Sequence, residues 1–211
     1  IFERMYVEEL EAAGMPHEAL ARETVLAREA AAWVADLEAR RRADGRAIYV
    51  ELEGKLTLDL PGGPFVVTAK ADRIEIDPEG RGHILDYKTG KAPSKKVVDT
   101  GFSPQLTLTA AILQAGGFPT LGHPDPGELT YLEITGRRPA GREEVRAMAG
   151  DESALAAANA YQGLAKLIDQ FDRGRPYVSR IAPQFVKLHM SDYDHLARVF
   201  EWSTSGEEGE E

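Results

Sequence analysis

Three residues of this sequence have the types and spacing that could support chemistry on a phosphate: Asp72, Asp86 and Lys88. Asp86 and Lys88 lie in "HILDYK", a short apolar run that predicts a strand. Alternate residues of a strand point to the same face, so we expect Asp86 and Lys88 to share one face with Ile84. An acid and a base therefore lie side by side at the end of a predicted strand.

Asp72 is expected in a similar setting on the preceding strand. It lies in "KADRIEID", and the two-residue period places Val66, Ile74 and Ile76 on its face. An unpaired ionised carboxylate in apolar surroundings is costly, so such groups are paired or bind a metal ion. If neighbouring strands bring Asp72 beside Asp86, a hard divalent cation such as Mg²⁺ relieves their repulsion. A lysine on the same face could then orient a water molecule or neutralise a phosphate.

A purely structural interpretation also fits these residues. An Asp-x-Lys triplet is expected about once by chance in a chain of this length. Asp86 and Lys88 could form an ordinary salt bridge at a strand end, while Asp72 pairs with Arg73 or another cation. The triplet alone does not separate the two interpretations.

Charge gives a second indication of where a polyanion could bind. The chain carries a formal charge of −10, which argues against nucleic-acid binding through its overall field but leaves a local site open. Between Asp86 and Asp99 the chain has several lysines and no acid, which suits either a solvated loop or contacts with phosphates. We predict phosphate contacts from three of these lysines: Lys91, Lys95 and Lys96.

Composition restricts the protein class. The 211 residues include no Cys, which excludes disulfide bonds, thiol nucleophiles and an iron–sulfur cluster held by this chain. We find no apolar run of membrane-spanning length and no signal peptide, so we expect a cytoplasmic protein without a membrane partner. The absence of an initiator Met suggests a piece of a longer chain.

Periodicity predicts the order of the elements. Apolar residues at helical spacing predict helices over 1–13 and 16–43. From residue 47 the period becomes two, with apolar residues at even positions from Ile48 through Val50 to Leu60. Strands follow over 65–77 and 83–88, then a helix over 104–115, a strand over 128–136 and a helix over 151–171. Short Gly-containing connections indicate an antiparallel meander for the first three strands.

This order predicts a mixed α/β (α+β) fold with flanking helices. We expect N-terminal helices over 1–46 that pack on the core, a core with C-terminal helices over 47–205, and a disordered acidic tail over 206–211.

The segments "KADRIEID", "ILDYKTGKAP" and "PQLTLTAAIL" together resemble the nuclease domain of the RecB and AddB family, within the PD-(D/E)xK superfamily. The segment "YDHLARVFEWS" at 193–203 is similar to the far C-terminus of AddB-type subunits. The resemblance covers about residues 47–203 and implies the restriction-endonuclease-like core, whose α-β-β-β-α-β order matches the one predicted here.

Carried over position by position, the resemblance implies a role for each site residue. Asp72 and Asp86 become metal ligands, with the backbone carbonyl of Tyr87 as a possible third. Lys88 becomes the catalytic lysine, and Gln105 the glutamine that assists it. The implied metal is Mg²⁺, for which Mn²⁺ substitutes.

The sequence departs from the family pattern in several respects, one of them Ala69, which stands where a Gly is common. Thr109 stands where the family has a Tyr after the glutamine. A metal-ligating His is expected shortly before a segment like "IFERM", with which this sequence opens. Some members also hold an iron–sulfur cluster, and the lack of Cys removes it here.

The resemblance therefore implies a metal-dependent DNA exonuclease domain of a helicase–nuclease that acts in double-strand break repair. Its partners would be linear DNA ends, a single strand that emerges from a helicase, and an AddA-like helicase–nuclease subunit. The alternative is a catalytically silent nuclease-fold module that binds DNA ends or a partner subunit. A Cas4-like or resolvase-like nuclease of the same superfamily is disfavoured by the segment at 193–203.

Overall fold

The computed structural model describes residues 2–176 and residue 196. Contacts divide the chain into two units, 1–167 and 168–211, and the architecture described below is that of the first. The elements are α1 (Phe2–Ala12), α2 (His17–Ala43), β1 (Ala47–Leu60), β2 (Gly63–Ile76), β3 (Gly82–Lys88), α3 (Lys95–Asp99), α4 (Gln105–Gln114), β4 (Pro126–Ile134), β5 (Gly141–Ala147) and α5 (Asp151–Asp172). The segment at 193–203 and the acidic tail lie outside the described residues, apart from Leu196.

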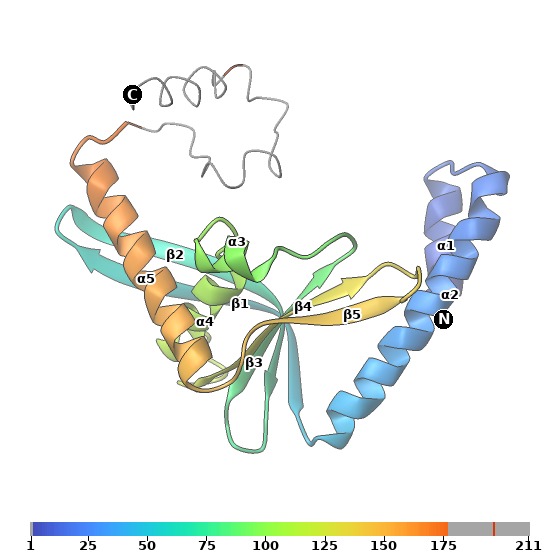
Figure 1. Ribbon diagram of the computed structural model, residues 1–211, viewed down its shortest axis with the longest axis horizontal. Helices are drawn as coiled ribbons and strands as arrows, with labels where there is room; N and C mark the ends of the chain where they lie inside the picture. The colour runs from blue at the N-terminus through green and yellow to red at the C-terminus, as the bar shows by residue number, and fades with distance from the viewer. Residues whose placement is uncertain (1, 177–195, 197–211) are drawn as a thin grey trace, which may run out of the picture. The chain divides into compact units, whose positions relative to one another are not determined.

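The five strands form one mixed sheet in the order β1-β2-β3-β4-β5 (Figure 1). The pairs β1–β2, β2–β3 and β4–β5 are antiparallel, whereas β3 and β4 are parallel. A parallel pair needs a long crossover, and residues 89–125, with α3 and α4, provide it. The predicted mixed α/β fold with its antiparallel meander is confirmed.

The main hydrophobic core lies between one face of the sheet and helices α4 and α5. Ile74 and Ile84 of the sheet pack against Ala110 and Ile112 of α4, and Ala157 of α5 belongs to the same cluster. Helix α4 is buried almost throughout, because the outer part of the long β1–β2 hairpin packs against it as well. This packing fixes the position of Gln105, the first residue of α4, within the crossover that joins β3 to β4.

The opposite face of the sheet is held by α2 through a small apolar cluster and a buried ionic network. Leu37 of α2 packs on Leu85 and Leu132, with Trp33 against them. Beside this cluster, Glu75 is fully buried and forms ion pairs with Arg41 at 2.8 Å, Arg46 at 3.2 Å and Arg73 at 2.6 Å.

Two further carboxylates balance the charge of this network. Arg41 also pairs with Glu143 of β5 at 2.6 Å, and Arg73 pairs with Glu38 of α2. Burial opposes ionisation of Glu38 and Glu143, but their arginine partners hold the pKa of each below its usual range. The network therefore links α2 to β2 and β5 by paired charges, which is the form in which buried ions are tolerated.

The inward-facing phase of the β1–β2 hairpin changes in its middle. Glu51 has φ 54, a left-handed conformation that is rare for a non-Gly residue, and it lies across from Asp72. Beyond this point the alternation shifts, so Ala71 is buried while Val66 is 54% exposed. The prediction that Val66 shares a face with Asp72 and Ile74 was wrong, and Val50 of the alternating apolar positions is exposed, since a strict two-residue period does not continue through such a distortion.

The sequence pattern missed two elements. The lysine-rich segment before Asp99 is the short helix α3, with the Ser94 hydroxyl accepting a bond from the Val97 N–H at 3.4 Å. Strand β5 was missed because "GREEVRA" is nearly all polar, and it lies at the sheet edge. Within the described residues, no helix combines the length and apolarity that a membrane span requires.

Replacement of Glu75 by Gln should lower the free energy of unfolding by about 3–5 kcal/mol, because it leaves buried arginines without their central partner. Urea unfolding followed by circular dichroism measures the change. Glu79→Gln is the matched control, since Glu79 is exposed and pairs only with Arg81 in the described structure. Equal urea midpoints for the two variants would contradict a stabilising role for the network.

Candidate active site

The candidate site lies where β2 and β3 separate. Their ladder pairs Ile74 with Ile84 and ends at Arg73 and Leu85, so the next positions in register are Asp72 and Asp86. Instead of a backbone partner on β2, the N–H of Tyr87 donates to the Asp72 Oδ2 atom at 3.0 Å. The end of the ladder thus brings the two predicted carboxylates together.

Asp86 is the more buried of the two carboxylates. It is 3% exposed, and burial raises its pKa above the usual value. Lys88 opposes this rise, with its Nζ atom 2.5 Å from the Asp86 Oδ2 atom, while the carboxylate of Asp72 adds to it. The Oδ2 atom nevertheless has no hydrogen bond of acceptable geometry in the described structure. Two close carboxylates with one incompletely satisfied oxygen form a site that a cation would stabilise.

Lys88 is positioned by three contacts. Besides Asp86, its Nζ atom donates to the Gln105 Oε1 atom at 3.2 Å and lies 5.4 Å from the centre of the Tyr131 ring. Gln105 is the first residue of α4 and is exposed, which leaves its amide available to Lys88. Thr109, which stands where the family has a Tyr, lies one turn further along α4 and is buried. A threonine offers no aromatic surface at this place.

Tyr131 supports the site and was not identified from the sequence. It is paired in register with Asp86 on the parallel strand, and its hydroxyl lies 3.2 Å from the Ser103 Oγ atom. Burial raises its pKa, so the ring presents a neutral face to Lys88. The guanidinium of Arg146 lies 5.8 Å from the same ring centre. Only the parallel β3–β4 pairing, which the sequence did not specify, could have indicated these neighbours.

Glu133 is a second residue that the sequence analysis missed. Its Oε1 atom accepts from the Ala92 N–H at 2.6 Å, and its position in β4 is paired with Lys88. This bond holds the segment that follows β3, including Lys91, against the neighbouring strand.

The ligand set suits Mg²⁺ better than a cation that needs many protein ligands. Asp72 and Asp86 are the two available carboxylates, and the Tyr87 carbonyl was the third expected ligand. Among the described residues, no group of three His, Asp or Glu side chains could hold a metal ion. Mg²⁺ is typically bound by one or two carboxylates and completes its shell with water and substrate phosphates. The residues present therefore fit that ion.

The structural interpretation of the same residues holds only in part. Asp86 and Lys88 do form an ion pair, but Arg73 turns to the opposite face of the sheet and bonds Glu75 and Glu38. Asp72 is therefore not neutralised by its neighbour in sequence.

The three lysines expected at phosphates lie in different settings. Lys91 is exposed and has no carboxylate within 4.0 Å among the described residues. Lys95 pairs with Glu152 at 2.8 Å and with Asp99 at 3.7 Å, and it also donates to the Arg146 carbonyl. Lys96 is exposed on α3. Lys95 is thus already engaged by two carboxylates, whereas Lys91 is not.

Comparison with known proteins provides a family. The sequence profile of the PD-(D/E)XK nuclease superfamily matches residues 1–180. Among solved structures, the crystal structure of SSO0001 matches 76% of this chain and 68% of its own, with a TM-score of 0.34 and 15% identity.

The curated relatives are uncharacterized proteins of Rickettsia. One from Rickettsia conorii is 40% identical over 92 residues, which are 41% of this chain and 11% of that protein. One from Rickettsia felis is 42% identical over 78 residues, which are 37% of this chain and 9% of that protein. The matched part thus spans about a tenth of these relatives.

The raised pKa of Asp86 predicts a pH-dependent difference between the wild-type protein and the Asp86→Asn variant without metal. The folded protein keeps a proton on Asp86 at pH values where the unfolded chain has released it, so this group's contribution to stability falls as the pH rises above the ordinary Asp range. Asparagine removes that loss.

We therefore expect the Tm of Asp86→Asn to rise relative to wild type as the pH increases from 4 to 8. Differential scanning calorimetry in EDTA measures this change. A difference in Tm that is the same at every pH would show that the ionisation of Asp86 is not strained in the fold.

Proposed function

This chain belongs to the PD-(D/E)XK nuclease superfamily, and from that premise we propose that it is a Mg²⁺-dependent deoxyribonuclease that hydrolyses phosphodiester bonds at the Asp72–Asp86–Lys88 site. The observation that carries the proposal is the convergence of these three residues where β2 and β3 separate, with Gln105 bonded to Lys88.

Each residue has a role in the proposed reaction. Asp72 and Asp86 would hold the metal ion, with the Tyr87 carbonyl as a third ligand. The bound ion would supply Lewis-acid polarisation of the phosphate and a water molecule of lowered pKa. Lys88 would stabilise the negative charge that builds up on the phosphoryl oxygens. Gln105 and the ring of Tyr131 would hold the Lys88 amine in place, which spares the reaction the cost of ordering it.

The ion pair between Lys88 and Asp86 supports a second role for Lys88 in the proposed site. The Lys88 amine partly neutralises the Asp86 carboxylate. A cation on Asp86 would take over that role and release the Lys88 amine toward the substrate, with Gln105 still bonded to it.

A finer assignment follows from the sequence resemblance. We propose that the chain acts as the exonuclease part of a helicase–nuclease in double-strand break repair, in the cytoplasm, on DNA ends and with an AddA-like partner subunit. Its support is the similarity of residues 193–203 to the end of AddB-type subunits, a segment outside the described residues. Mn²⁺ should substitute for Mg²⁺, because both are hard cations that accept oxygen ligands.

Lys88→Ala should reduce DNA cleavage by about 10²–10⁴-fold, the usual contribution of a positioned charged or proton-transferring group. The assay is the release of labelled nucleotides from linear DNA in Mg²⁺, on the purified chain. Lys55→Ala is the matched control, because Lys55 is an exposed lysine on β1, away from the site. Cleavage at the wild-type rate by Lys88→Ala would disprove the catalytic assignment.

Metal binding should be separable from turnover. Titration calorimetry with Mn²⁺ should show saturable binding to the wild-type chain and none to Asp86→Ala, since that variant loses the more buried of the two ligands. Binding without cleavage by the wild-type chain would favour the alternative of a catalytically silent module. Unchanged binding by Asp86→Ala would place the metal elsewhere.

A further inference from the structure

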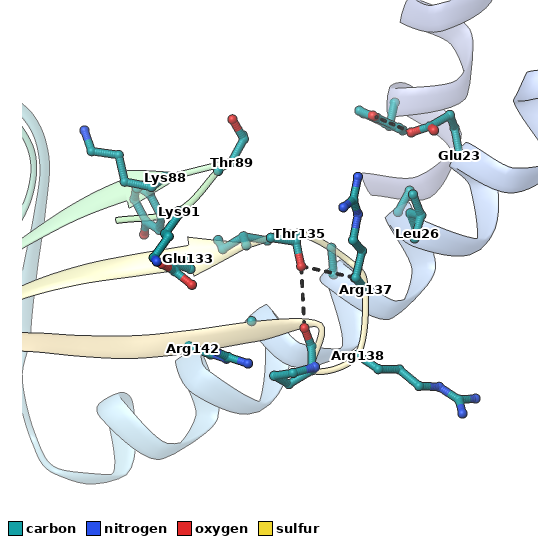
Figure 2. A pocket seen from close by; sticks show the side chains of 18 of the residues that line it. Glu23, Leu26, Lys88, Thr89, Lys91, Glu133, Thr135, Arg137, Arg138 and Arg142 are labelled. Atoms are coloured by element: carbon teal, nitrogen blue, oxygen red, sulfur yellow. Dashed lines mark hydrogen bonds between the residues drawn. The ribbon is translucent and has the colours of Figure 1, made fainter. Parts of the chain in front are cut away.

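A cleft of about 780 Å³ lies beside the candidate active site, between α2 and the β4–β5 hairpin (Figure 2). One wall comes from α1 and α2, with Tyr6, Arg22 and Leu26, and the other from the hairpin. Its floor is the end of β3 and the segment after it, Tyr87 to Lys91. Lys88 thus belongs both to the candidate active site and to the cleft lining.

The cleft gathers cations that have no partner elsewhere in the described structure. Five lining residues have no carboxylate within 4.0 Å in the part of the chain described here: Arg22, Lys91, Arg137, Arg138 and Arg142. The pairing differs elsewhere, since Arg41, Arg73 and Arg146 are all in ion pairs. A chain with a formal charge of −10 has ample carboxylates, so unpaired cations gathered in one cleft indicate an anionic ligand from outside.

The two carboxylates of the cleft do not neutralise these cations. Glu133 accepts from the Ala92 N–H at 2.6 Å, and Glu23 accepts from the Tyr6 hydroxyl at 3.5 Å. In Figure 2, Arg137 projects from the hairpin toward α2, the helix that carries Glu23 and Leu26. The guanidinium groups are therefore available to bind an anion in the cleft.

The walls are held at a fixed spacing by close backbone packing. A Cβ atom at Gly136, which has φ 64, would lie 2.1 Å from the carbonyl oxygen of Leu26 in α2. A Cβ atom at Gly141 would lie 2.4 Å from the Trp33 ring. The hairpin therefore contacts α2 at two points where only glycine fits, and the cleft exists before any ligand binds.

We propose that this cleft binds the sugar-phosphate backbone of the nucleic-acid strand whose scissile bond lies at Lys88. The inference rests on the proposed nuclease function and extends it to a path for the strand. Arg22, Arg137 and Arg142 bind its phosphates, and the half-exposed ring of Tyr87 offers a flat surface to a base. Contacts of this kind position a strand without reading its sequence.

The test is binding of a fluorescein-labelled single-stranded 12-nucleotide oligothymidine by anisotropy, in EDTA so that no cleavage takes place. The double variant Arg137→Glu/Arg142→Glu should weaken binding at least tenfold and flatten the dependence of log K on log salt by about 1–2. Arg137→Lys/Arg142→Lys should retain most of the affinity, because the charge is preserved. Lys55→Glu, which reverses one charge at an exposed lysine outside the cleft, should bind as the wild type does.

Wild-type affinity in the double Glu variant, or an equal loss in Lys55→Glu, would overturn the assignment of the cleft. The anisotropy measurement in EDTA reports binding and does not depend on whether the protein cleaves DNA. Cleavage by the wild type with unaltered binding by the double Glu variant would refute the cleft alone. Loss of binding in that variant, together with no cleavage by the wild type in Mg²⁺, would refute the nuclease proposal while supporting the cleft.

Discussion

The ionic network around Glu75 is the interaction on which the rest of this structure depends. It joins α2 to the sheet, and its arginines reach the site as well, because Arg73 also donates to the Tyr87 hydroxyl at 3.1 Å. The N–H of that same tyrosine holds the Asp72 carboxylate. A single buried carboxylate thus anchors the helix that forms one wall of the cleft and, through Arg73 and Tyr87, the strand end that carries Asp86 and Lys88.

The candidate site contains an unfavourable pair of carboxylates held by well-satisfied neighbouring contacts. Two carboxylates lie where the β2–β3 ladder ends, and burial raises the pKa of Asp86. A fold optimised for stability alone would not bury Asp86 so close to Asp72. The surrounding contacts are by contrast well satisfied, since Lys88 is held by Gln105 and by the Tyr131 ring, and Tyr131 is held by Ser103. Strain confined to the groups expected to bind a cation, on a firmly packed frame, is the arrangement that functional sites commonly show.

The cations that stabilise the fold differ from those proposed to bind a ligand in whether they have carboxylate partners. The arginines of the network around Glu75 form ion pairs with carboxylates of the protein itself, and Lys95 is paired with Glu152. The arginines of the β4–β5 hairpin, Arg137, Arg138 and Arg142, have no such partners among the described residues. The net charge of −10 sums all acids and bases of the chain, so it does not reveal that these arginines are unpaired in the described structure.

The sequence by itself predicted the antiparallel meander, the order of the helices and strands apart from α3 and β5, and a candidate site at Asp72, Asp86 and Lys88, to which the family resemblance added Gln105. Periodicity and short Gly-containing turns are local signals, and an acid and a base two apart on a strand share a face wherever that strand lies. The sequence could not reveal β5, whose polar residues show no period. It also gave no sign that the inward-facing positions of the β1–β2 hairpin change at Glu51.

Tertiary structure alone decided which residues surround those four. The parallel β3–β4 pairing brings Tyr131 and Glu133 beside the site across more than forty residues of chain, and the packing of the hairpin on α2 gathers unpaired arginines in one cleft. Arg41 illustrates the reason. From its place in the last turn of α2 it reads as an ordinary helix-ending cation, yet it is buried against Glu75, because ion pairing depends on distance in space and not on spacing in the chain.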